Sequence, residues 1–145
     1  MIRPATTADL DAIMEIEECA FAGDKFPRRR WRYLLTTAHA VVLVEASRGN
    51  VRAAAVVVFR RGSRVARLYS IAVHPGHRGR GIARRLLHQC EQVARAQGCR
   101  SLRLEVRVEN VSARRLYATS RYALVGRTAD YYEDGGEALR FERPL

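Results

Sequence analysis

Residues 68–83 read "LYSIAVHPGHRGRGIA", a strand-like run that passes through closely spaced glycines into an apolar segment. Within it, "RGRGIA" occupies 78–83, with an arginine on each side of its first glycine. Glycines at a strand-to-helix turn let backbone N–H groups converge on one point, and the helix N-terminus adds partial positive charge there. The stretch therefore predicts a loop that binds a phosphate group.

Two familiar phosphate-binding loops do not match this stretch. The dinucleotide fingerprint G-x-G-x-x-G, counted from Gly79 and Gly81, needs a third glycine where Arg84 stands. The nucleotide-triphosphate loop G-x-x-x-x-G-K-[ST] fits the spacing of Gly76 and Gly81, but "IA" follows in place of the lysine and the hydroxyl. The loop is therefore expected to hold another kind of phosphate compound.

Length and composition indicate one globular domain. The chain has 145 residues, 48% of them hydrophobic, which is enough for a compact domain over 1–145 with its own core. The apolar runs "AVVLV" and "AAAVVVF" have the length of strands and are too short to span a bilayer. The N-terminus lacks the basic-then-apolar pattern of a signal peptide. We therefore expect a cytoplasmic protein with no membrane segment.

Cysteines and histidines give no metal-binding pattern. Cys19, Cys90 and Cys99 are an odd number without a C-x-x-C pair, which argues against a disulfide framework and a zinc site. His74 and His77 flank a Pro-Gly pair, but no acid or thiol stands near them in the sequence to complete a site. We expect no metal.

The chain is strongly basic, with a formal net charge of +11 and a pI near 10.7. Such a surface attracts polyanions, which include nucleic acid, ribosomes and a multiply phosphorylated cofactor. The excess charge is mostly arginine and is spread along the chain, as a GC-rich genome would also produce. Association with nucleic acid or the ribosome therefore stays open at this point, and the sequence leaves the oligomeric state undetermined.

Hydrophobic periodicity and turn residues predict the element order β-α-α-β-β-β-α-β-α-β-β. Hairpins and a single β-α-β crossover make this a mixed α/β domain with a mostly antiparallel sheet. In chain order we expect a strand at 1–5, a helix capped by Thr7, a break at 21–26, a helix with Pro27 in its first turn, strands at 40–46, 51–60 and 65–73, a helix from 82 that ends at Gly98, a strand at 101–108, a short helix at 112–120, and strands at 122–129 and 137–145.

The blocks around the glycine loop resemble the GNAT acetyltransferase superfamily. Its cofactor signature Q/R-x-x-G-x-G/A, between a strand and a long helix, is satisfied by Arg78, Gly81 and Ala83. The upstream "IAVHP" and the downstream "LEVRVEN" and "ARRLY" follow at the expected distances. The resemblance covers essentially the whole chain and is nearest to the bacterial ribosomal-protein-alanine N-acetyltransferases.

This resemblance implies an acetyl-CoA-dependent N-acetyltransferase. The glycine loop would bind the pyrophosphate through its backbone, and the strand before it would pair with the pantetheine arm as one strand edge pairs with another. An N–H at or near Val73 would stabilise the oxyanion that develops on the thioester. The residues implied in cofactor binding are Ile71, Ala72, Val73, Arg78, Gly79, Arg80, Gly81, Ile82, Ala83 and Asn110.

The resemblance also implies the two proton-transfer residues, Glu105 as acceptor and Tyr117 as donor. Glu105 stands between Arg103 and Arg107 on a strictly alternating strand, so ion pairing on an exposed strand face is an equally simple interpretation of it. Those arginines would favour the ionised carboxylate and a relay through water. Tyr117 also suits an ordinary core position.

Three arginines raise two separate questions. Arg84 and Arg85 fit either a solvated helix face or contact with the 3′-phosphate of the cofactor. Arg121 stands before Tyr122 where the family usually has glycine before an aromatic residue. A glycine there adopts positive φ readily, so its replacement predicts an altered turn beside Tyr117.

The resemblance places the acceptor amine between the loop after the first helix and the loop that joins the last two strands. The second loop reads "DYYEDGGE" (130–137) and is the densest acidic segment of the chain. A negative patch on a positive protein would draw in a cationic amine, whereas Asp and Gly are also simply common in turns. The first helix adds further acidic residues that we expect near the same acceptor entrance, namely Glu15, Glu17 and Glu18.

We therefore expect the acceptor to be a peptide N-terminus or a lysine amine, bound beside Tyr131, Tyr132 and Glu133. A polyamine or an aminoglycoside is the alternative within the same chemistry. The alternative from another class is a non-catalytic module that uses this fold to bind nucleic acid or the ribosome. Such a module has no need for Glu105, Asn110 and Tyr117 at their spacings.

Overall fold

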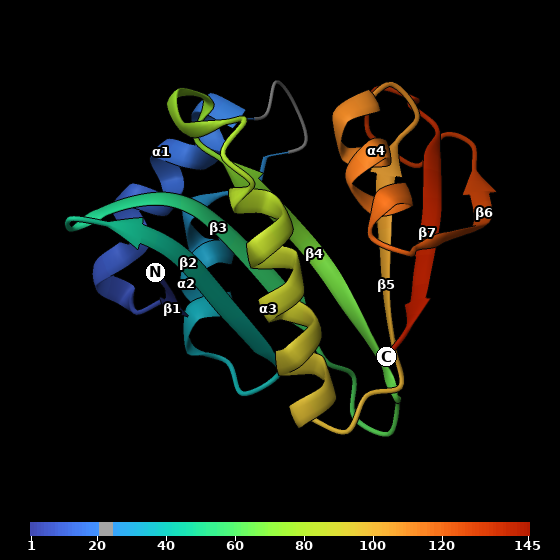
Figure 1. The fold of residues 1–145 in the computed structure, drawn as a ribbon, viewed down its shortest axis with the longest axis horizontal. Helices are drawn as coiled ribbons and strands as arrows, with labels where there is room; N and C mark the ends of the chain where they lie inside the picture. The colour runs from blue at the N-terminus through green and yellow to red at the C-terminus, as the bar shows by residue number, and fades with distance from the viewer. Residues whose placement is uncertain (21–24) are drawn as a thin grey trace.

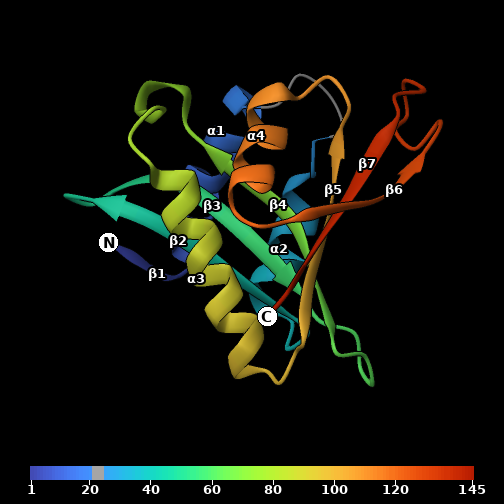
Figure 2. The ribbon, with the colours of Figure 1, turned by 45° about the vertical axis from the view of Figure 1, so that its right-hand side comes forward.

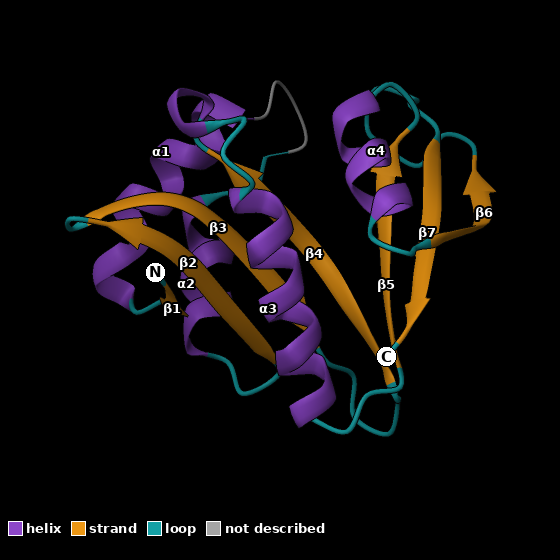
Figure 3. Ribbon diagram, viewed as in Figure 1, coloured by secondary structure: helices purple, strands orange, loops and turns teal. Residues whose placement is uncertain are grey.

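The computed structural model describes residues 1–20 and 25–145, which form one seven-stranded sheet with helices on both faces (Figures 1 and 3). The strands are β1 (Ile2–Pro4), β2 (Ala40–Ser47), β3 (Asn50–Val58), β4 (Val65–Val73), β5 (Ser101–Arg107), β6 (Ala123–Thr128) and β7 (Ala138–Pro144). The helices are α1 (Leu10–Ala20), α2 (Arg28–Thr36), α3 (Ile82–Ala96) and α4 (Val111–Thr119), with 3-10 turns η1 (Thr7–Asp9) and η2 (Pro75–His77).

The sheet order is β1-β2-β3-β4-β5-β7-β6. Each neighbouring pair is antiparallel except β4 and β5, which are parallel and are joined through α3. The predicted mixed α/β fold class, its mostly antiparallel sheet and its β-α-β crossover are therefore confirmed. Among the described residues no helix is long and apolar enough to cross a membrane.

The centre of the sheet is buried on both faces, and β3 shows how. Ala53, Ala55 and Val57 pack in the cluster that includes α3, whereas Ala54 and Val56 pack in the cluster formed with α1 and α2. This is the two-residue alternation of a pleated strand, which sends successive side chains to opposite faces. Figures 1 and 2 both show α3 on the face opposite α1 and α2. The two faces together form the core that holds the site.

The start of the first helical segment differs from the prediction. Thr6 rather than Thr7 is the cap, because its hydroxyl accepts the N–H of Ala8 and Asp9 accepts the N–H of Thr6. This reciprocal capping box uses the T-x-x-D spacing of Thr6 and Asp9. Arg3 of β1 then donates two 2.8 Å hydrogen bonds to the Asp9 carboxylate. The prediction of Thr7 was wrong by one residue.

The break after α1 is only partly described. Residues 21–24 of the predicted break at 21–26 lie outside the described residues, and α1 ends at Ala20. Pro27 directly precedes α2, one position earlier than predicted, and its carbonyl accepts the N–H of Arg30. Inside α2, Trp31 and Leu34 are buried as its apolar spacing predicts.

The feature that positions the site is the separation of β4 from β5. They pair over 65–68 against 101–104 and no further, whereas β4 stays paired with β3 to Val73. Val57 lies opposite Leu68 and Val56 opposite Ser70, so Tyr69 is an extra residue in β4. Such a bulge bends a strand and increases its twist. Figure 1 shows β4 and β5 meeting near the C-terminus and diverging toward η2 and α4.

Candidate active site

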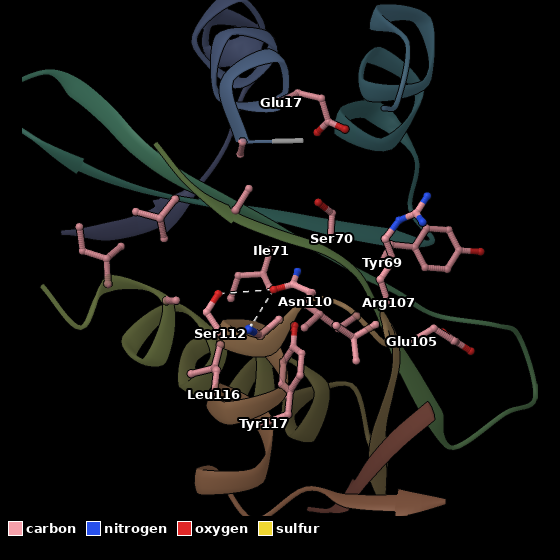
Figure 4. A pocket seen from close by; sticks show the side chains of 18 of the residues that line it. Glu17, Tyr69, Ser70, Ile71, Glu105, Arg107, Asn110, Ser112, Leu116 and Tyr117 are labelled. Atoms are coloured by element: carbon pink, nitrogen blue, oxygen red, sulfur yellow. Dashed lines mark hydrogen bonds between the residues drawn. The ribbon is translucent and has the colours of Figure 1, made fainter. Parts of the chain in front are cut away.

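A cavity of about 930 Å³ opens where β4 and β5 part (Figure 4). On one face of the sheet its wall comes from η2, the glycine loop, α3 and α4, and on the other face from the end of α1, the start of α2 and the β6–β7 loop. Figure 4 shows Glu17 on one side of β4 and Tyr117 on the other. The cavity therefore connects the two faces of the sheet.

Most of the residues predicted for the site line this cavity. The wall includes Ile71, Ala72, Val73, Arg78, Gly79, Gly81, Ile82, Ala83, Glu105, Asn110, Tyr117, Tyr131 and Tyr132. Arg80 and Glu133 are not part of the wall. The Arg80 carbonyl accepts a 3.0 Å hydrogen bond from Arg85 Nη1 instead, and Glu133 is exposed on the β6–β7 loop. The fold thus gathers residues from six separate segments at one place.

The β4 edge of the cavity is an unpaired strand edge inside the sheet. Ile71, Ala72 and Val73 pair with β3 through one edge, and β5 has already left the other edge. The backbone groups on that second edge need partners, because buried backbone donors and acceptors are costly when unpaired. An arm that carries amide groups, such as pantetheine, can pair there as an added strand would.

The glycine loop forms the cradle at the start of α3. Gly79 has φ +79° and Gly81 has φ +73°, a left-handed conformation that glycine adopts without steric cost. Gly81 directly precedes the first residue of α3, a helix of 15 residues whose N-terminal N–H groups lack partners within the helix. The loop therefore presents backbone donors and the positive end of the helix to the cavity, which suits a pyrophosphate.

Arg84 and Arg85 have different roles. Arg84 lines the cavity and donates to the hydroxyls of Thr119 (2.9 Å) and Ser120 (3.0 Å) at the end of α4. Arg85 lies 3.8 Å from the buried carboxylate of Glu45 and also holds the glycine loop through the Arg80 carbonyl. Both arginines thus have protein partners, so a simple solvated helix face describes neither of them.

Glu105 lies in the cavity wall with its side chain 9% exposed. Its carboxylate accepts a 2.7 Å bond from Arg67 of β4 and a 3.4 Å bond from Arg140 of β7. The expected pairing with Arg103 and Arg107 is wrong, because Arg140 is directly opposite Glu105 in the register and Arg67 reaches it from β4. Arg103 pairs with Glu142 and Arg107 with Asp134.

Tyr117 reaches the cavity from α4 with 4% of its surface exposed. Its ring packs against those of Tyr122 and Phe141, at centroid distances of 5.7 and 6.1 Å. Figure 4 shows its hydroxyl pointing toward Asn110 and Ile71. Burial raises the pKa of this hydroxyl well above its usual range, so the Tyr117 hydroxyl stays protonated at ordinary pH.

Asn110 both caps α4 and faces the cavity. Its Oδ1 accepts the N–H of Ala113 at 3.1 Å and the hydroxyl of Ser112 at 3.4 Å. Because the oxygen is used by the helix, the amide nitrogen is the group left to meet a ligand, and Figure 4 shows it pointing toward β4. Asn110 is thus the N-cap of α4.

The β6–β7 loop contributes rings rather than free acid to the cavity. Tyr131 and Tyr132 meet edge to face at 4.9 Å, and the Arg107 guanidinium lies 4.1 Å from the centre of the Tyr132 ring. Arg107 also pairs with Asp134 and lowers the pKa of that carboxyl. Glu137 of the same loop pairs with Arg127. Arginines therefore offset part of the acidic charge that the sequence places here.

The wall from α1 and α2 contains residues that the sequence analysis did not single out. The Arg30 guanidinium lies 5.0 Å from the ring centre of Phe26 and 5.7 Å from that of Tyr69, and Arg67 lies 5.6 Å from the same Tyr69 ring. The available signal was the alternation of arginine with aromatic residues in "KFPRRRW" and "RLYS". This side of the cavity thus combines rings and guanidinium groups.

The three acidic residues of α1 do not act together. Glu17 is buried and lines the cavity, whereas Glu18 is exposed and pairs with Lys25. Glu15 is exposed, 4.0 Å from His74. Glu17 alone lies four residues after Ile13 and seven after Leu10, on the buried stripe of the helix, and this periodicity distinguishes it in the sequence.

The wall fits a coenzyme A ester in three respects: the glycine cradle, the unpaired β4 edge and a cavity that leads from the cradle through the sheet. The cradle residues would hold the pyrophosphate and β4 the amide-bearing arm. Among residues 1–20 and 25–145, no three His, Cys, Asp or Glu side chains are grouped so that they could hold a metal ion.

Comparison with known proteins agrees with this geometry. The profile of the family described as "Acetyltransferase (GNAT) family" matches residues 10–120. The N-alpha-acetyltransferase RimI of Mycobacterium tuberculosis is 31% identical over 147 residues, covering 95% of this chain and 88% of that protein. Streptothricin acetyltransferase of Streptomyces lavendulae is 31% identical over 100 residues, 66% of this chain and 53% of that protein.

Among solved structures, the ribosomal-protein-S18-alanine N-acetyltransferase of Escherichia coli superposes with a TM-score of 0.89 at 26% identity, over 100% of this chain and 93% of that chain. The chain therefore belongs to the GNAT acetyltransferase family. It is an N-acetyltransferase, and acetyl-CoA is its acetyl donor.

Proposed function

We propose that this enzyme acetylates the amine of a peptide or protein, either an N-terminal α-amine or a lysine amine. The observation that carries the proposal is that Arg30, Tyr69 and Tyr131 line the cavity and are also exposed at the surface. Rings and guanidinium groups of this kind contact an extended peptide well. Two relatives that act on protein amines by their names support the same choice.

In this proposal, separate groups of residues bind the donor, stabilise the oxyanion and transfer protons. The 78–83 backbone and Asn110 hold the donor, and the β4 edge at 71–73 aligns it. Acetyl-CoA supplies an activated thioester when bound. The Val73 N–H donates to the thioester oxygen as negative charge develops there. Glu105 accepts a proton from the attacking amine, directly or through water, and Tyr117 donates a proton to the departing sulfur.

An acceptor panel tests the proposed substrate class. We expect the highest kcat/KM with peptides, measured as coenzyme A release with a basic N-terminal peptide, an acidic one, spermidine and an aminoglycoside. Glu133→Lys with Asp134→Lys separates the role of the acidic loop, and we expect it to lower activity with the basic peptide most. Activity confined to spermidine or the aminoglycoside would contradict the proposal.

The proton assignments need a test of their own. Glu105→Gln keeps the shape of the side chain and removes its charge, so we expect both a lower kcat and a changed pH–rate profile. Acetyl-CoA affinity, measured by calorimetry, should stay close to that of the parent. Parental turnover at every pH would remove Glu105 from the mechanism.

A small-molecule amine is the second candidate, and one observation favours it. Streptothricin acetyltransferase, named for an antibiotic substrate, matches two-thirds of the chain at an identity equal to that of the protein-directed relative. The association of the basic surface with nucleic acid or the ribosome stays a prediction. A salt titration of the binding of the protein to RNA would measure this association, because contacts with phosphate weaken steeply with salt.

A further inference from the structure

Glu17 is a buried carboxylate that faces the acceptor side of the cavity, and the mechanism above does not use it. Its surface is 4% exposed, and it lies in the wall that α1 forms. Oε1 accepts the N–H of Phe26 at 2.8 Å, and the Trp31 side chain also interacts with the carboxylate. A buried carboxylate with so little compensation is costly unless a cation meets it.

The charged and titratable groups near Glu17 or elsewhere in the wall of the same cavity come from several elements. They are Lys25 before α2, Arg30 of α2, Arg67 and Tyr69 of β4, Glu105 and Arg107 of β5, His77 of η2, and Tyr131 and Tyr132 of the β6–β7 loop. Lys25 pairs with Glu18, and Arg67 with Glu105. No ion pair to Glu17 is present among the described residues. Burial raises the pKa of Glu17, and the Phe26 N–H, the Trp31 side chain and the charge of Lys25 oppose this effect.

Glu105 is a poorer partner for a cation than Glu17. Arg67 and Arg140 already surround the Glu105 carboxylate and compensate its charge. An acceptor amine enters mainly as an ammonium ion at neutral pH, because amines of this kind are protonated there. Its positive charge is therefore better matched by a carboxylate that is not already held in an ion pair, as Glu105 is.

We propose that Glu17 binds the ammonium form of the acceptor amine and removes its first proton. This rests on the proposed function, since it concerns the acceptor of the same cavity. The ammonium N–H bond breaks, and its proton passes to a Glu17 oxygen. The free amine then forms a bond to the acetyl carbon, and the C–S bond breaks with its electron pair on sulfur.

The remaining protons balance the reaction. Glu105 takes the second proton of the attacking nitrogen, and Tyr117 gives one proton to sulfur. Tyr117 regains its proton from Glu105, and Glu17 releases its proton to solvent. One ammonium ion and one thioester therefore become one amide, one thiol and one released proton.

Glu17→Gln tests this proposal, because a glutamine oxygen still accepts the Phe26 N–H while the charge is gone. With a basic N-terminal peptide, we expect kcat/KM to fall by at least about 10-fold at about pH 7. The loss should shrink as the pH passes the pKa of the peptide α-amine, about 8, where the neutral amine enters directly. Acetyl-CoA affinity and thermal stability should match those of the parent.

Glu17→Ala and Glu18→Gln complete the set. Glu17→Ala removes both the charge and the Phe26 contact, and should lose stability as well as activity. Glu18→Gln alters the neighbouring carboxylate outside the cavity, and should keep parental kinetics. Parental kcat/KM for Glu17→Gln at about pH 7, or an equal loss at every pH, would overturn the role of Glu17. A parent enzyme inactive on every peptide would instead contradict the proposed substrate class.

Discussion

The packing of Tyr117 fixes its orientation, because its ring is buried between Tyr122 and Phe141 while its hydroxyl reaches the cavity. Tyr117→Phe removes the hydroxyl that is proposed to donate the proton and keeps the ring packing. We expect kcat to fall about 100-fold, with acetyl-CoA affinity little changed. Steady-state kinetics and calorimetry measure the two effects. Tyr33→Phe, an exposed ring on α2, is the control, and parental kcat in Tyr117→Phe would exclude it as the donor.

Arg121 carries local backbone strain beside the same helix. The replacement of glycine predicts an altered turn there, but Arg121 keeps the left-handed conformation at φ +70°, and the N–H of Tyr122 donates to the Tyr117 carbonyl. A non-glycine residue pays a steric cost for this conformation. Arg121→Gly should therefore raise the free energy of unfolding by about 0.5–1 kcal/mol, the relief of strain exceeding the added freedom of the unfolded chain.

Thermal denaturation measures this gain, and kcat should stay parental because Arg121 does not line the cavity. Arg115→Gly is the matched control, since Arg115 is exposed in the interior of α4. It should lower stability by about 1 kcal/mol, the usual cost of glycine in a helix. The two substitutions of arginine by glycine should thus change the free energy of unfolding in opposite directions. A loss of stability in Arg121→Gly would contradict backbone strain at Arg121.

The glycine loop before α3 is the element proposed to bind the pyrophosphate. Gly81→Glu places a side chain and a negative charge where the pyrophosphate is proposed to bind, and should abolish acetyl-CoA binding in calorimetry. Gly49→Glu is the matched control, because Gly49 has a similar φ of +80° and open space around it in the β2–β3 turn. Both variants carry the same backbone strain, so equal loss of binding in the two would contradict a specific cradle.

The junction of β1 and α1 should make stability depend on pH. Hydrogen bonds from Arg3 lower the pKa of Asp9 despite its burial. A carboxyl whose pKa is lower in the folded state stabilises the fold above its unfolded pKa, and this contribution is lost as the pH falls through the folded value. Asp9→Asn should therefore cost about 1–2 kcal/mol at neutral pH and little at about pH 2. Urea unfolding at both pH values measures the difference, and an equal cost at both would contradict the ionic origin.

The helices and strands could be predicted from the sequence because hydrophobic periodicity is local. The side-chain contacts between strands could not be predicted in this way. The alternation of 101–108 gives β5, and the spacing of Ile82, Leu86 and Cys90 gives α3, each within a residue or two. The partners of Glu105 depend instead on the register of β4 and β7, which no neighbouring residue encodes. The bulge at Tyr69 has the same origin, so the cavity it opens could be inferred from the resemblance alone.

The whole molecule consists of two half-sheets that meet along a short seam. Strands β1–β4 with α1–α3 form one half, and β5–β7 with α4 form the other, with strand pairing between them limited to 65–68 and 101–104 (Figure 1). Side chains from α3 add further links, through Arg84 to the end of α4 and through Glu91 to the second half. Arg84 itself lines the cavity, so at least this link borders the candidate active site.

Glu91 is the most buried of these links. It is 2% exposed, and its carboxylate accepts a 2.7 Å bond from the Tyr122 hydroxyl and a 2.9 Å bond from Arg143 of β7. Removal of one partner from a buried pair leaves the others without compensation, which typically costs about 3–5 kcal/mol. We expect Glu91→Ala to lower the free energy of unfolding by roughly this amount in urea unfolding, while the Tyr122 hydroxyl stays buried.

Glu142→Ala provides the comparison, because the Glu142–Arg103 pair joins neighbouring strands within one half and is 27% and 40% exposed. Partly exposed pairs contribute about 1 kcal/mol or less. If the seam governs the site, Glu91→Ala should also weaken acetyl-CoA binding, since the donor is proposed to contact both β4 and α4. Glu142→Ala should leave that affinity unchanged. Equal stability losses in the two variants, with acetyl-CoA affinity unaffected in both, would show that the two half-sheets are held together by the strands alone.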